Sequence, residues 1–170
     1  TASEGGWFAM NAPPEVGGVG LPETVAMAAT EMLAGAGFAF WMYPGLTTAA
    51  ARILRLKGSE QIGANYAEKM YTGEWTGTML LTEPEAGSDV GASTTKAVKQ
   101  DDGTYSISGE KIFITSGDHD LTENIVHLVL AKLPGAENST KGISLFVVPK
   151  HLPETGERNQ LACGGLEHKM

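Results

Sequence analysis

The chain has little cysteine: Cys163 is the only one among 170 residues. A single cysteine excludes an internal disulfide framework, and it fits a reducing compartment such as a cytoplasm. Nothing nearby pairs Cys163 with a general base. We therefore predict a bystander thiol at this position and not a nucleophile.

Basic residues and long apolar runs are also few. Lys and Arg number 12 against 20 Asp and Glu, which gives a formal charge of −8. Proteins that bind nucleic acids or anionic membranes concentrate Lys and Arg, so the composition argues against both classes. No stretch is expected to span a bilayer, and the N-terminus shows no signal peptide. Hydrophobic residues make up 42% of the chain, which is enough for a core.

Two polar or glycine-rich segments resemble ligand sites only superficially. Asp118, His119, Asp120 and His127 could be metal ligands, but three adjacent side chains on a regular strand cannot all point at one ion. We predict a polar loop there, and no metal. The run at 17–20 is rich in glycine but lacks the Lys-Ser/Thr of a P-loop, so it is not expected to bind a nucleotide.

Residues 1–75 have the apolar spacing of helices, with glycines at the expected ends. Proline in a first turn and an N-capping serine mark the expected starts. The predicted helices are Pro22–Leu33, ended by Gly35 and Gly37; Pro44–Leu56, ended by Gly58; and Glu60–Met70, capped by Ser59 and ended by Gly73.

Residues 76–170 have the pattern of strands separated by short turns, with a strong hairpin signal at Asp101-Asp102-Gly103. The predicted strands are Thr76–Thr82, Thr94–Gln100, Thr104–Ser108, Lys111–Thr115, Ile125–Lys132, Gly142–Pro149 and a last strand that covers Gln160–Cys163 or runs on to Met170. We predict an α+β fold: an N-terminal helical region, residues 1–75, followed by an antiparallel β-barrel or sandwich domain, residues 76–170.

The run from Leu80 to Gly91 is the most informative stretch. An apolar strand ends at Thr82, and a turn follows that contains one proline, two glycines, a serine and three acids. Such a turn can present backbone N–H groups and a hydroxyl to a ligand. Its string Leu-Thr-Glu-Pro-x-Ala-Gly-Ser-Asp resembles the signature of the acyl-CoA dehydrogenases, flavoenzymes that desaturate acyl-CoA thioesters. The family usually has a small residue or cysteine where Leu80 stands.

A second informative stretch runs from Gly109 to Gly117. If residues 111–115 form a strand, Ile112 and Ile114 share one face and Phe113 and Thr115 share the other. From spacing alone, a half-exposed strand is the simpler interpretation. The string Gly-x-Lys-x-aromatic-Ile-Thr, however, resembles the second flavin-contacting segment of the same family. The family usually has Trp where Phe113 stands, and Phe lacks the indole donor.

The resemblance covers essentially the whole chain. The segments at 118–127 and 156–159 resemble the larger bacterial members, and residues 167–170 resemble the strand just before the family's C-terminal helical domain. The resemblance implies a fragment that lacks this domain and the catalytic glutamate base within it. No catalytic residue is therefore expected in the chain, and the isolated fragment is expected to be inactive.

The resemblance also implies roles for residues on both segments. Thr82 would hydrogen-bond at the pyrimidine edge of FAD, Thr115 would donate toward N5 or O4, and Ser88 could also touch the substrate. Glu83 and Asp89 would fix the turn through bonds to backbone N–H groups. The expected cofactor-binding residues are Met79, Leu81, Thr82, Gly87, Ser88, Phe113, Ile114 and Thr115.

The implied enzyme is an FAD-dependent acyl-CoA dehydrogenase of fatty acid β-oxidation. It would take a proton from Cα of the thioester and a hydride from Cβ, giving a trans-2-enoyl-CoA. The expected partners are an acyl-CoA substrate, electron-transfer flavoprotein as electron acceptor and further copies of the same subunit. Two alternatives remain open: a related acyl-CoA oxidase or flavin monooxygenase on the same fold, and a non-enzymatic β-domain binding module.

Overall fold

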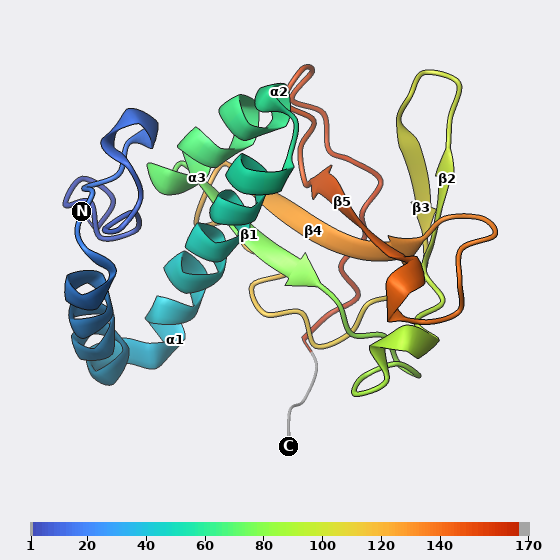
Figure 1. The fold of residues 1–170 in the computed structure, drawn as a ribbon, viewed down its shortest axis with the longest axis horizontal. Coiled ribbons are helices and arrows are strands. Elements are labelled where there is room, and N and C mark those ends of the chain that lie inside the picture. Colours follow the sequence, from blue (N-terminus) through green and yellow to red (C-terminus); the bar gives the residue numbers. More distant parts are fainter. Residues whose placement is uncertain (1, 167–170) are drawn as a thin grey trace.

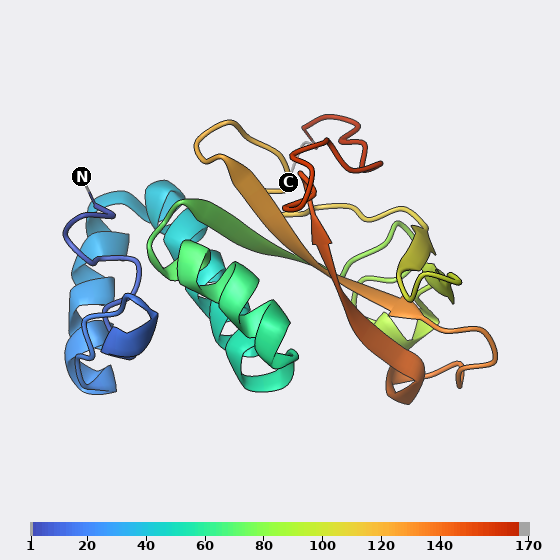
Figure 2. The ribbon, with the colours of Figure 1, turned by 90° about the horizontal axis from the view of Figure 1, so that it is seen from above.

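A computed structural model describes residues 2–166 (Figure 1). Helices form one side of the molecule and a twisted sheet the other, and the second view shows the same division (Figure 2). A short 3-10 turn, η1 (Pro14–Val16), lies in the N-terminal segment. The α+β class with an N-terminal helical region is confirmed.

The first helix, α1, spans Glu23–Lys57 and bends at Gly37, whose φ of −168° and ψ of 77° are not helical. The bend makes two arms that meet at an angle (Figure 1). A break near Gly37 is therefore confirmed, but a new start at Pro44 is wrong. Pro44 lies inside the second arm, because the apolar residues just before it already continue the helix. The Oγ1 of Thr48 donates to the Pro44 carbonyl at 2.9 Å.

By length and composition alone, α1 could cross a membrane, so the expectation that no stretch could do so is wrong. An 18-residue window of it has a mean hydropathy of 1.3, and only 6% of that window is buried. The expectation failed because it stopped the apolar segment at Gly35 and Gly37. One such helix is weak support for a membrane span, since core helices and signal sequences have the same properties. Met32 and Phe38 are among its exposed side chains.

The third predicted helix is confirmed as a run of three pieces: α2 (Glu60–Ile62), the π-helical turn η2 (Gly63–Ala67) and α3 (Glu68–Tyr71). The Ser59 side chain caps it by accepting a hydrogen bond from the Ile62 N–H at 3.2 Å. Gly73, with a φ of 79°, takes the left-handed conformation just after its end.

In the part of the chain that the structure describes, five strands form one sheet: β1 (Trp75–Leu80), β2 (Lys96–Lys99), β3 (Tyr105–Ser108), β4 (Asn124–Lys132) and β5 (Ile143–Pro149). All five were predicted to within two residues at each end. The sheet is mixed and not antiparallel throughout: β4 runs parallel to β1 and β2 and antiparallel to β5. The long segment between β1 and β4 brings the chain back to the end of the sheet at which β1 begins, so β4 runs in the same direction as β1.

The core lies between the helices and one face of the sheet. Val126 and Leu128 of β4 point to this face, and Gly77 of β1 lets the helices approach, since a Cβ there would lie 2.9 Å from the Ala50 Cβ. The other face of β4 carries Ile125 and His127, both fully buried. Residues 160–163, predicted to be a strand, are irregular, and the proposed extension at 167–170 lies outside the described residues.

Candidate functional site

The turn after β1 is looped out of the sheet between two anchor points on β4. Strand β1 pairs with β4 as far as Leu80 opposite Val129. The chain then leaves the sheet and returns where the Lys132 N–H donates to the Thr95 carbonyl at 2.9 Å. Residues 81–94 therefore project as a loop from a fixed edge, and the loop contains the short 3-10 turn η3 (Val90–Ala92).

Glu83 holds this loop together from the inside. Its carboxylate accepts bonds from Thr94, from N–H at 2.6 Å and Oγ1 at 2.9 Å, and from Thr95, from N–H at 3.1 Å and Oγ1 at 2.6 Å. Lys111 Nζ adds an ion pair at 2.8 Å, and the two side chains are only 3% and 6% exposed. The structure thus agrees with the predicted turn-fixing role of Glu83.

The electrostatics of Glu83 follow from this environment. Burial by itself would raise the pKa of the carboxyl, but the hydrogen bonds from Lys111, from the Thr95 hydroxyl and from the two backbone N–H groups outweigh it. The pKa of Glu83 is lowered from 4.5 to about 2. The carboxylate is therefore ionised at neutral pH and acts as a structural anion.

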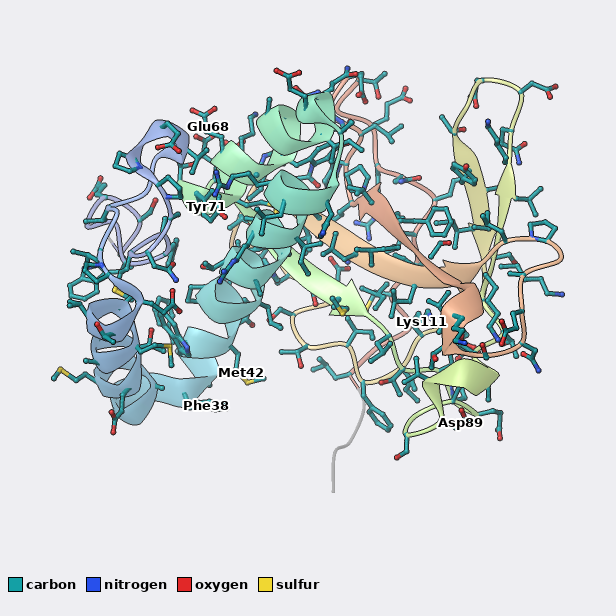
Figure 3. All side chains as sticks on the ribbon, viewed as in Figure 1. Phe38, Met42, Glu68, Tyr71, Asp89 and Lys111 are labelled. Carbon is teal, nitrogen blue, oxygen red and sulfur yellow. The ribbon has the colours of Figure 1, made fainter. Side chains whose placement is uncertain are left out.

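Lys111 joins the two informative stretches, a role that sequence reasoning missed. Its Nζ also donates to the Leu81 carbonyl at 3.1 Å, and the Ile112 N–H donates to the Thr82 carbonyl at 2.9 Å. Gly109 permits the approach, because a Cβ there would lie 2.8 Å from the Thr95 Cα. The signal was available in the Gly-x-Lys string, whose glycine and lysine both serve this junction. Lys111 lies close to the projecting loop, on which Asp89 is labelled (Figure 3).

The predicted strand Lys111–Thr115 is wrong. Phe113 has a φ of 58° and Ser116 a φ of 55°, so the segment turns through left-handed conformations and its side chains do not alternate. A backbone conformation of this kind in a residue other than glycine costs about 1–3 kcal/mol, and such strained residues cluster at functional sites. Phe113 is also 47% exposed, so core packing does not account for the strain.

The candidate cofactor residues lie on these two adjoining segments. Thr78 Oγ1 donates to the Thr115 carbonyl at 2.6 Å and so ties the second segment to β1. Met79 and Phe113 are exposed apolar side chains. Within residues 2–166, no group pairs with the hydroxyls of Thr82, Ser88 or Thr115. The remaining candidates are Leu81 and Ile114, both half-buried, and the exposed Gly87.

This set of groups suits a planar apolar ring with a hydrogen-bonding edge. Exposed apolar side chains can cover a ring face, and unpaired hydroxyls and backbone N–H groups can meet its polar atoms. A flavin has this chemistry, so the residues present fit FAD.

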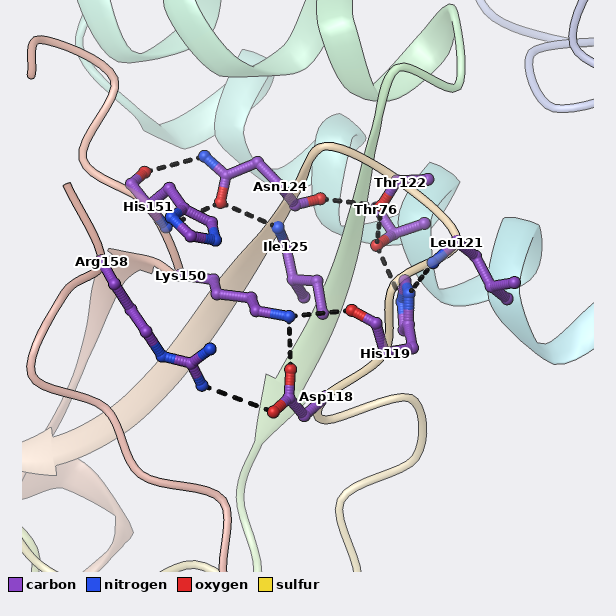
Figure 4. Close-up of polar contacts among 10 residues, drawn as sticks. All are labelled: Thr76, Asp118, His119, Leu121, Thr122, Asn124, Ile125, Lys150, His151 and Arg158. Atoms are coloured by element: carbon purple, nitrogen blue, oxygen red, sulfur yellow. Dashed lines mark hydrogen bonds and ion pairs between the residues drawn. The ribbon is translucent and has the colours of Figure 1, made fainter. Parts of the chain in front are cut away.

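The polar segment at 118–127 forms a separate hydrogen-bond network (Figure 4). The Leu121 N–H donates to His119 Nδ1, so the neutral ring carries its proton on Nε2, which lies 3.1 Å from Thr76 Oγ1. Burial, followed by the charge of Lys150, lowers the pKa of His119. Asp118 pairs with Lys150 at 2.5 Å. These contacts tie the loop to the sheet. No group of three or more His, Cys, Asp or Glu suited to a metal is found among residues 2–166.

Two family models match the chain. "Acyl-CoA dehydrogenase, N-terminal domain" matches residues 1–74, and "Acyl-CoA dehydrogenase, middle domain" matches residues 78–169. Among curated relatives, 3-methylmercaptopropionyl-CoA dehydrogenase of Ruegeria pomeroyi is 53% identical over 97% of the chain. The chain spans 29% of the length of that relative.

Solved structures agree with the family models. An acyl-CoA dehydrogenase complexed with FAD from Bacillus anthracis has a TM-score of 0.72 and 31% identity, over 88% of this chain and 25% of that one. A chain in a structure described as the electron transferring flavoprotein of Acidaminococcus fermentans has a TM-score of 0.72 and 30% identity, over 86% of this chain and 37% of that one.

Proposed function

Because the chain belongs to the acyl-CoA dehydrogenase family, we propose that it supplies part of the FAD-binding edge of an acyl-CoA dehydrogenase. One observation carries the proposal. Two segments far apart in sequence, 79–88 and 111–115, are joined by Lys111 and present unpaired hydroxyls beside exposed apolar side chains.

The proposed roles follow from this arrangement. Thr82 and Thr115 would donate to the polar edge of the ring, and Phe113 would cover part of its apolar surface. Ser88 would lie where the acyl-CoA chain reaches the ring. Met79, Leu81, Gly87 and Ile114 complete the proposed contact set. FAD, when bound, would supply the two-electron acceptor, and the residues of this chain would orient it.

The proposed reaction is α,β-desaturation of an acyl-CoA thioester. A proton would leave Cα for a glutamate base outside residues 1–170, and a hydride would leave Cβ for the cofactor, which yields a trans-2-enoyl-CoA. Preorganised donors such as Thr115 would stabilise the charge that develops as the hydride departs. The chain by itself is proposed to be inactive.

The wider setting is proposed from the relatives. We propose electron-transfer flavoprotein as the electron acceptor, which is supported by the match to a chain in an electron transferring flavoprotein structure. We also propose a homo-oligomer in the bacterial cytoplasm. The substrate would be an acyl-CoA, as the name of the Ruegeria relative suggests for that protein.

Replacing Thr115 by valine tests the proposed donor in the full-length protein. The change keeps the shape of the side chain but removes the unpaired hydroxyl. We expect anaerobic reduction by acyl-CoA to slow about 100-fold, the usual effect of losing one such donor. The Thr78 bond to the Thr115 carbonyl is preserved, so the melting temperature should change little. Stopped-flow absorbance of the flavin measures the rate.

Ile112→Val is the matched control, since it removes one methylene from a nearby half-buried position outside the proposed contact set. It should lower the free energy of unfolding by about 1 kcal/mol or less and leave the reduction rate unchanged. The reverse pattern, with Ile112→Val slowing reduction and Thr115→Val having no effect, would remove Thr115 from the site.

A further inference from the structure

The buried ammonium of Lys111 contacts a backbone carbonyl at the proposed cofactor edge. Its Nζ lies 3.1 Å from the Leu81 carbonyl oxygen and 2.8 Å from Glu83 Oε1. The Leu81 carbonyl and the Thr82 N–H belong to the same peptide group. The side chain of Lys111 is 6% exposed, so little water screens its charge.

A cation at a carbonyl oxygen polarises the whole amide and makes its N–H a stronger donor. The Leu81–Thr82 amide is therefore more positive on its N–H side than an ordinary peptide. Such a donor binds an electron-rich partner better than an electron-poor one. Glu83 keeps Lys111 in place, because its carboxylate is itself held by Thr94 and Thr95.

We propose that Lys111, positioned by Glu83, raises the reduction potential of the bound cofactor by polarising the Leu81–Thr82 amide. This inference rests on the proposed function. Lys111 is a positioning residue that acts through Thr82, and its positive charge favours the reduced cofactor over the oxidised one. Glu83 has the opposite sign and offsets part of this effect.

Charge variants of the pair in the full-length FAD-loaded protein test the proposal. Lys111→Met leaves one negative charge, so we expect the preference for reduced over oxidised cofactor to fall about tenfold, a potential about 30 mV lower. Glu83→Gln leaves one positive charge, and the preference should rise about tenfold. The double variant is neutral again and should return to within threefold of the wild type. Equilibrium reduction against indicator dyes measures all four proteins.

Lys132→Met is the matched control. Lys132 Nζ also donates to a backbone carbonyl of the same loop, that of Gly91 at 2.6 Å, but it does not contact the Leu81–Thr82 amide. Its removal should leave the potential unchanged. A shift as large as that of Lys111→Met would mean that the general charge of the loop sets the potential, and this would overturn the specific role of Lys111.

The opposite directions of the two potential shifts distinguish an electrostatic effect on the cofactor from a purely structural role of the pair. A purely structural pair would weaken FAD retention in both single variants and shift the potential in one direction or not at all, which would overturn the proposal. If Lys111→Met fails to fold, Glu83→Gln must still raise the potential and the double variant must restore it. A wild-type protein that binds no FAD would overturn the proposed function and this inference with it. FAD binding without opposite shifts would overturn the inference alone.

Discussion

Replacing Glu83 by alanine should lower the free energy of unfolding by about 3–5 kcal/mol, the usual effect of breaking a buried ion pair from one side. The change leaves Lys111 buried without its counter-ion and deprives four donors of Thr94 and Thr95 of their acceptor. Thermal unfolding of the full-length protein measures the loss. Hydrogen exchange of the Thr94 and Thr95 amides should show it locally.

Glu85→Ala is the control within the same turn. Glu85 is exposed, so its removal should leave both the melting temperature and the exchange of the Thr94 and Thr95 amides unchanged. Equal effects of the two variants would show that the buried carboxylate does not hold the loop.

Protonation of Glu83 in acid should have the same effect as its replacement by alanine. The pKa of Glu83 is lowered to about 2, so the stabilisation of about 3 kcal/mol is present above pH 5 and is lost toward pH 2.

Lowering the pH from 7 to 5 should destabilise the protein by about 2 kcal/mol through His127 alone. This residue is 1% exposed, and its two ring nitrogens have no partner among the described residues. Burial lowers the pKa of His127 from 6.5 to about 4. Below pH 6.5 the unfolded chain binds a proton at His127, whereas the folded protein binds this proton only near pH 4. The free energy of unfolding therefore falls as the pH falls from 6.5 toward 4.

His127→Leu should remove this part of the pH dependence and leave stability at pH 7 unchanged or slightly higher, because leucine needs no hydrogen-bond partner. A smaller acid slope should remain from His119, whose pKa is also lowered by burial. Melting temperatures at pH 7 and pH 5 give the comparison. An imidazole NMR signal of His127 that titrates near pH 6.5 in the folded protein would contradict the account.

Local patterns predicted most of the elements. The Ser59 cap, the glycine stops and the hairpin at 101–103 act over a few residues, so the sequence alone is sufficient to place them. The parallel pairing of β1 with β4 could not be predicted in this way. It depends on where a 43-residue excursion between Leu80 and Asn124 returns, which is a property of the whole chain.

The candidate site was predicted by motif and not by geometry. The segment at 111–115 has a strand-like composition, but the bonds of Lys111 and the turn at Phe113 replace the expected alternation. Pro44 failed as a helix start for a related reason, since packing of the second arm of α1 on β1 outweighs the bond that a proline removes. In both places tertiary contacts overrode a local preference.

Oxygen consumption separates the proposed dehydrogenase from its redox alternatives. An acyl-CoA oxidase on the same fold would consume oxygen during turnover with acyl-CoA, and a flavin monooxygenase would consume oxygen only when an external reductant is added. The proposed enzyme would instead need an electron acceptor such as electron-transfer flavoprotein.

The visible spectrum of the purified full-length protein tests the central claim most directly. We expect an FAD spectrum that bleaches when an acyl-CoA is added without oxygen, with the extent depending on the acyl chain across a panel of thioesters. A colourless protein that gains no visible absorbance after reconstitution with FAD would contradict the claim and favour a non-enzymatic binding module.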